Sequence, residues 1–161
     1  MEEFQLARQK AQIKFKIADH MLTQTYPLVK DPKLLVAVME NLFLALTNAM
    51  ASVLYYERTF KNIPPFVDNF ENKFKIFKDR CTPKYRLSQV YIKLIADIKE
   101  SVLAHRKSPI EFARKDNFVI CSDNYRLKTI SIEQIKEYIE MTKTFLKETD
   151  TIVSKDERIF R

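Results

Sequence analysis

The stretch from Leu34 to Tyr56 constrains the fold more than any other part of the chain. Its twenty-three residues contain one formal charge, Glu40. A stretch of this length can span a bilayer, form the central helix of a soluble bundle, or bury part of its surface against a second copy of the protein. No other segment is long and apolar enough to accompany it across a membrane. We therefore predict a bundle's central helix and no membrane span.

Polar residues within this stretch follow a helical spacing. They recur at intervals of seven, four and three residues, and they are Asn41, Asn48, Ser52 and Tyr55. This spacing places them along one edge of a helix, where unpaired polar groups would be costly if they were buried. We predict that the edge is satisfied by a neighbouring helix or by a second subunit, and that these four residues make dimer contacts.

The chain contains no glycine among its 161 residues. Glycine-rich loops that hold the phosphates of nucleotides are therefore excluded, which disfavours the common nucleotide-dependent enzymes. Left-handed turns and bulges usually need glycine, so its absence favours a mostly helical fold. We expect one domain over residues 1–153 and a fraying tail over residues 154–161.

Periodicity and capping signals predict about five helices. The first covers residues 2–26 and carries a second apolar stripe of Leu6, Ile13, Ile17 and Met21, which suggests two neighbours. Asp31 and Pro32 begin the second helix, which runs to about Phe60. A third, shorter helix presents Phe66, Phe70, Phe74 and Phe77 on one face; a fourth begins at Thr82 and Pro83 and ends near His105.

The C-terminal third mixes two kinds of signal. Ser108, Pro109 and Glu111 form a capping box that predicts one short helix. Residues 117–130 alternate around a turn and predict a small β-hairpin. Ser131 and Gln134 predict a capping box for the last helix, which runs to about residue 153. The whole pattern predicts an all-α, up-and-down helical bundle with this one hairpin.

The chain is basic, with a net charge of +7, and its cations are concentrated between residues 73 and 86. This group comprises Lys73, Lys75, Lys78, Arg80, Lys84 and Arg86, and a second group comprises Arg106, Lys107, Arg114 and Lys115. Such clusters are typical of surfaces that contact phosphates, and also of ordinary solvated helices. We expect the partner to be RNA, a ribonucleoprotein or an acidic protein.

The sequence does not favour a metal site or a catalytic nucleophile. His20 and His105 lack an acidic residue three positions earlier, and Cys81 and Cys121 have no second pair. We therefore expect no metal and no cofactor. The N-terminal residues are acidic and lack an apolar segment, which predicts a cytoplasmic protein.

His105 is the one catalytic candidate. It follows the predicted buried face of its helix, with Lys99 and Arg106 as cations that would hold a phosphate. The alternative is structural, because a histidine near a helix C-terminus also interacts well with the negative end of the helix dipole.

The order of elements resembles that of the HEPN superfamily of small helical bundles. The resemblance rests on the long apolar second helix, the element beginning at Ser108, the hairpin, and the amphipathic last helix beginning at Ile130. It implies a dimer that is either a ribonuclease, with four to six residues between an arginine and the histidine that follows it, or an inactive partner of a nucleotidyltransferase.

The chain departs from this ribonuclease motif. The corresponding positions hold Ile98, Lys99 and Glu100 before His105, and Ile13, Lys14 and Phe15 before His20. Lysine does not replace arginine at a forked phosphate contact. The sequence therefore favours a non-enzymatic, dimeric binding module, with a divergent ribonuclease or a purely structural scaffold as alternatives.

Overall fold

The structure is a computed structural model of the chain. It describes residues 2–107, 110–114, 117–121 and 127–155, with the side chains of residues 2–105 and 130–155. Its helices are α1 (Glu3–His20), α2 (Tyr26–Val29), α3 (Pro32–Thr59), α4 (Phe70–Ile76), α5 (Thr82–Tyr85), α6 (Gln89–Lys107) and α7 (Ile132–Val153). Its strands are β1 (Ile110–Arg114), β2 (Asn117–Cys121) and β3 (Leu127–Ser131).

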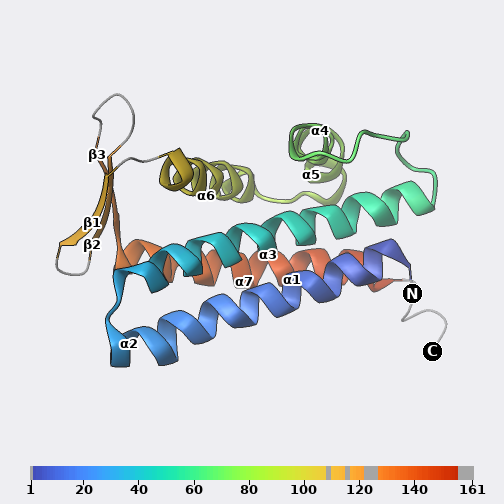
Figure 1. Cartoon of the computed structure of the whole chain (residues 1–161). Coiled ribbons are helices and arrows are strands. Elements are labelled where there is room, and N and C mark those ends of the chain that lie inside the picture. Colours follow the sequence, from blue (N-terminus) through green and yellow to red (C-terminus); the bar gives the residue numbers. More distant parts are fainter. Residues whose placement is uncertain (1, 108–109, 115–116, 122–126, 156–161) are drawn as a thin grey trace.

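The prediction of an all-α helical bundle is confirmed. Two π-helical turns, Met21–Thr25 and Phe77–Cys81, join α1 to α2 and α4 to α5 into continuous helices. Figure 1 shows α1, α3 and α7 lying alongside one another, with α6 and the α4–α5 helix beyond α3 and the strands at one end of the bundle. The strands form an antiparallel sheet in the order β1-β2-β3.

Helix α3 is the centre of the bundle, as predicted. It contacts α1, α6 and α7, and Leu42, Leu46 and Met50 are fully buried. The helix is long and apolar enough to cross a membrane by length and composition alone, and half of its most apolar window is buried inside the protein. Ala11 of α1 and Ala49 of α3 are also buried, and such small side chains let two helix backbones approach closely.

Helix ends are closed without glycine. Lys30, Lys61 and Arg86 adopt the left-handed conformation, with φ between 52° and 57°. This is the position where helices usually place glycine, and other residues occupy it at some cost in free energy. The two π turns are explained by the prolines that follow them, Pro27 and Pro83. A proline lacks the N–H that continues the regular helical hydrogen bonds.

Three details of the predicted helices are wrong. The helix predicted from Thr82 to His105 is divided in two. Helix α5 continues the π turn before it, with the Thr82 hydroxyl donating to the carbonyl of Lys78, and α6 starts only at Gln89. Phe66 precedes α4, whose first turn is capped by the Asn69 side chain accepting from the N–H of Asn72 at 2.9 Å. The first helix continues past Tyr26 to Val29.

The predicted short helix at Ser108 is also wrong. Ile110–Arg114 is strand β1, which pairs with β2 so that Phe112 lies opposite Val119. Five residues are too few for a stable helix, and pairing along the predicted hairpin satisfies their backbone groups instead. Ser108 and Pro109 themselves lie outside the described residues.

Helix α7 begins as predicted at Ser131, whose hydroxyl accepts from the N–H of Gln134 at 3.1 Å. The predicted capping box would have the Gln134 side chain accept from the backbone N–H of Ser131. Instead, the Gln134 side chain donates to the hydroxyl of Tyr138 at 2.8 Å. Of the predicted tail, Ser154 and Lys155 are described, and residues 156–161 lie outside the described part.

Candidate functional site

The predicted basic segment forms the α4–α5 helix and the residue that follows it. Two of its six cations are turned toward the rest of the protein. Lys73 forms an ion pair with Asp68, and Lys84 forms one with Glu57. These two side chains are therefore occupied by internal partners.

Glu57 is the most deeply buried charged residue of the described part, with 1% of its surface exposed. Its carboxylate accepts from the Lys84 ammonium at 2.7 Å and from the Tyr85 hydroxyl. Burial, together with the bond to Glu57, raises the pKa of Tyr85. Burial and the Glu57 charge likewise raise the pKa of the Cys81 thiol to about 12. This cluster holds α5 against α3 and leaves a protonated, unreactive thiol.

Lys73 belongs to a second polar cluster, at the junction of α3 and α4. Asp68 accepts a hydrogen bond from the Lys73 ammonium. It accepts another from the Tyr55 hydroxyl at 3.1 Å. The bond from Lys73 lowers the pKa of Asp68, and the bond from Tyr55 adds to this, against the opposing effect of burial. Burial lowers the pKa of Lys73, but its bonds to Asp68 and Tyr55 outweigh this and the net pKa is raised. Both groups are thus held in their charged forms.

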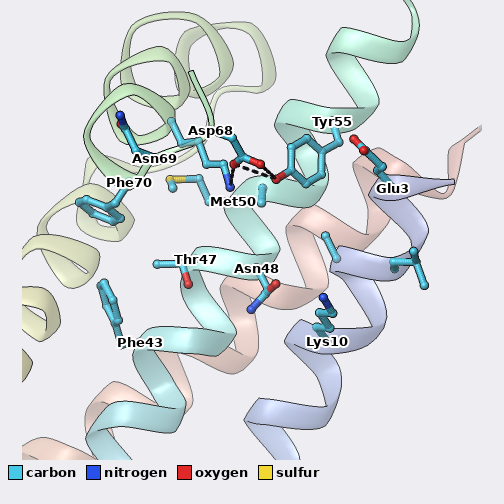
Figure 2. A pocket seen from close by; sticks show the side chains of 14 residues that line it. Glu3, Lys10, Phe43, Thr47, Asn48, Met50, Tyr55, Asp68, Asn69 and Phe70 are labelled. Carbon is cyan, nitrogen blue, oxygen red and sulfur yellow. Dashed lines mark hydrogen bonds and ion pairs between the residues drawn. The ribbon is translucent and has the colours of Figure 1, made fainter. Parts of the chain in front are cut away.

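This cluster closes one end of a groove between α1, α3 and α4, which we call the α4 groove. The groove has a volume of about 390 Å³. Figure 2 shows Phe43, Thr47 and Asn48 along its α3 wall, with Asp68 joined to Tyr55 at one end. Its charged lining residues are balanced in sign, with Lys10 and Lys73 against Glu3 and Asp68.

The other cations of the segment, Lys75, Lys78, Arg80 and Arg86, are exposed; we call them the basic surface. None of the four forms an ion pair or a side-chain hydrogen bond within the described residues. No large hydrophobic side chain is exposed between residues 68 and 89. The side chains of Arg106, Lys107 and Arg114, and the whole of Lys115, lie outside the described residues.

The catalytic candidates have different partners. The Nε2 atom of His105 lies 3.9 Å from a carboxylate oxygen of Glu40 on α3. Lys99 is bonded to Glu71, and its ammonium lies 4.3 Å from the centre of the Phe70 ring. Lys99 is therefore held by a carboxylate, whereas His105 lies near one without a hydrogen bond to it, and the Arg106 side chain lies outside the described residues.

The predicted dimer edge is largely satisfied within the chain. Asn41 and Asn48 donate to carbonyls of their own helix at 2.8 Å, and Tyr55 donates to Asp68. Ser52 is 1% exposed and donates to the carbonyl of Ala49. In this structure Ser52 consequently lies inside the bundle and not on a surface that a second copy reaches, whereas Asn41 and Asn48 are partly exposed.

Sequence reasoning missed the acidic partners Glu57 and Asp68. Glu57 lies just beyond the apolar run, on the same helix, and this position was the one signal that its side chain would be buried. Over the described residues there is no group of three or more histidine, cysteine, aspartate or glutamate side chains that would hold a metal ion.

Comparisons with known protein families, with curated proteins and with solved structures gave no match.

Proposed function

We propose that this protein is a non-enzymatic RNA-binding module that contacts phosphates through the basic surface. The observation that carries the proposal is the pairing pattern of the segment. Lys73 and Lys84 have acidic partners, whereas Lys75, Lys78, Arg80 and Arg86 are exposed without one in the described part of the chain. Exposed ammonium and guanidinium groups exchange counterions for phosphates at little cost.

The composition of the surface favours RNA over an acidic protein. Protein interfaces have an apolar core, commonly with aromatic anchors. The basic surface has no exposed large hydrophobic side chain, so it offers charge without such a core. Recognition by charge and shape suits structured RNA, either free or within a ribonucleoprotein.

The test is the salt dependence of RNA binding. A triple variant, Lys75→Glu, Lys78→Glu and Arg80→Glu, is compared with a control of equal net charge, Lys33→Glu, Lys93→Glu and Lys136→Glu. Binding of a fluorescent RNA hairpin is measured by anisotropy from 50 to 300 mM salt. We expect the first variant to bind weakly and to lower the slope of log K against log salt by about 2–3. Equal losses in both variants would contradict the proposal.

A cleavage assay tests the non-enzymatic part. The wild-type protein should leave the same hairpin intact, because the Lys99 ammonium is held by Glu71 and no arginine stands at the ribonuclease-motif positions before His105. Cleavage that disappears in His105→Ala, with binding retained, would show that the divergent ribonuclease is the better description.

The dimer remains part of the proposal, with its surface on α1 and α3. Two residues of the second stripe of α1, Leu6 and Ile13, are 44% and 54% exposed, and Leu44 of α3 is 40% exposed. A two-fold related copy would cover these apolar side chains with the same face of a second molecule. Ile13→Glu should convert a dimer to a monomer in sedimentation, and an unchanged mass would exclude this surface.

A further inference from the structure

A second groove lies between α1 and α7, and we call it the lysine groove. It has a volume of about 390 Å³ and is lined by Gln12, Phe15, Lys16, Lys143, Leu146, Lys147 and Asp150. The three lysines are exposed, and none of their ammonium groups forms an ion pair or a hydrogen bond within the described residues. The groove therefore carries three ammonium groups without local neutralisation.

The single carboxylate of the groove already has partners. Asp150 forms an ion pair with Arg8, and the Gln12 side chain donates to it at 3.4 Å. Both bonds reach the Oδ1 atom of Asp150, and no ion pair joins its carboxylate to the lysines within the described residues. The net charge at the open part of the groove is consequently positive.

The floor of the groove is apolar. Phe15 and Leu146 are half-buried and pack against the core. The Phe15 ring takes part in no ring-ring contact within the described part of the chain. The groove thus combines a flat aromatic surface with three cations at its rim, in a volume typical of small-molecule sites.

We propose that the lysine groove binds a nucleotide unit, with its phosphate on Lys16, Lys143 and Lys147 and its base against Phe15. Lysine is a flexible point charge that suits phosphate, and a base gains from stacking on an aromatic ring. The chain has no glycine for a phosphate-binding loop, and the polar groups that line this groove are side chains. The nucleotide is either free or part of a single-stranded RNA, since both present the same chemistry.

This site does not depend on the basic surface, which is formed by the α4–α5 helix and not by α1 and α7 (Figure 1). The lysine groove was hard to predict from the sequence. Lys143 and Lys147 belong to a face of mixed sign, and only the packing of α7 against α1 brings them to Lys16.

The test measures binding of uridine monophosphate by calorimetry and of an eight-nucleotide oligouridylate by anisotropy. The groove variant is Lys16→Gln, Lys143→Gln and Lys147→Gln; its matched control is Lys10→Gln, Lys33→Gln and Lys136→Gln. Phe15→Leu keeps an apolar floor and removes the ring, and circular dichroism checks that each variant is folded.

We expect the groove variant to lose at least tenfold in affinity, Phe15→Leu to lose about fivefold, and the control to stay within twofold. Binding of the monophosphate identifies a free nucleotide as sufficient, and binding of the oligonucleotide alone identifies single-stranded RNA. No binding of either probe, or equal losses in the groove variant and the control, would overturn the proposal. A loss in the lysine variant without one in Phe15→Leu would also overturn it, since the groove would then bind any anion.

The two proposals fail separately. If the oligonucleotide binds and is released only by Lys75→Glu, Lys78→Glu and Arg80→Glu, the lysine groove is excluded while the basic surface stands. If the groove variant alone releases both probes, and Lys75→Glu, Lys78→Glu and Arg80→Glu bind the RNA hairpin as tightly as their control, the basic surface is excluded and the groove stands.

Discussion

The α4 groove and the lysine groove have the same volume, about 390 Å³, and helix α1 contributes to both. They differ in how their charges are paired. In the α4 groove Lys73 is bonded to Asp68, and Glu3 pairs with Arg58 at 2.5 Å. In the lysine groove the one carboxylate is bonded to Arg8, and the lysines are left to solvent. The two grooves therefore differ in pairing and not in volume, and our proposal is that the unpaired lysines of the second one attract an anion.

The same distinction divides the basic segment itself. Lys84 neutralises the buried Glu57, whereas Lys78, six residues earlier, is exposed and has no such partner within the described residues. The sequence shows both as members of one cluster of cations. Their roles differ because only one of them faces a carboxylate across the packed interior.

The largest effect on stability should come from Lys84→Met. Removing this cation leaves the Glu57 carboxylate buried with the Tyr85 hydroxyl as its remaining side-chain partner in the described structure. Breaking a fully buried ion pair would cost more, but the Lys84 side chain is 47% exposed. We therefore expect a loss of about 2 kcal/mol in the free energy of unfolding. Urea denaturation measures it. Lys78→Met is the control, and its free energy of unfolding should stay within about 0.5 kcal/mol of the wild type. Equal losses in the two variants would show that the paired Lys84 stabilises the fold no more than the unpaired Lys78.

The next effect concerns binding and not stability. Lys143→Glu gives the lysine groove two lysines and two carboxylates, the same balance as the α4 groove. Affinity for uridine monophosphate should fall about tenfold, and the free energy of unfolding should change by less than about 0.5 kcal/mol, because the site is exposed. Lys136→Glu on the same helix provides the comparison. Affinity that falls equally in Lys136→Glu would show that only net charge matters.

The smallest effect is expected at Asp68. Its pKa is lowered in the folded protein, so its bonds stabilise the fold above the ordinary value of 3.8 and this contribution is lost as pH falls through the folded pKa. Asp68 is 60% exposed, and solvent screening limits the contribution to about 0.5 kcal/mol. Asp68→Asn should therefore be slightly less stable than the wild type at pH 7 and equally stable near pH 2. Thermal unfolding across this pH range checks the convergence; a constant difference would mean that the charge of Asp68 is not involved.

Local signals predicted most of the fold. The Asp31 cap, the apolar run after it and the Ser131 cap gave the two longest helices, since each signal depends on neighbours in sequence. The same local rules failed at Thr82, where proline lies inside a helix that widens to a π turn, and at Ile110, where strand pairing decided the conformation.

The candidate sites were less predictable, because they depend on contacts between distant residues. Lys84 meets Glu57 across 27 positions, and Gln12 meets Asp150 across 138. No pattern of spacing reports such pairs in a single sequence. The cations of the basic segment were therefore predictable as a group, and their division into paired and unpaired members was not.

Lysine acetylation measured by mass spectrometry, with and without RNA, tests the central claim most directly. Without RNA, Lys73 and Lys84 should react slowly because their ammonium groups are bonded, while Lys75, Lys78, Lys143 and Lys147 react quickly. With saturating single-stranded and hairpin RNA, protection should appear at the fast lysines and leave the slow pair unchanged. Uniform reactivity without RNA, or protection confined to Lys10 and Lys73 of the α4 groove, would contradict the account.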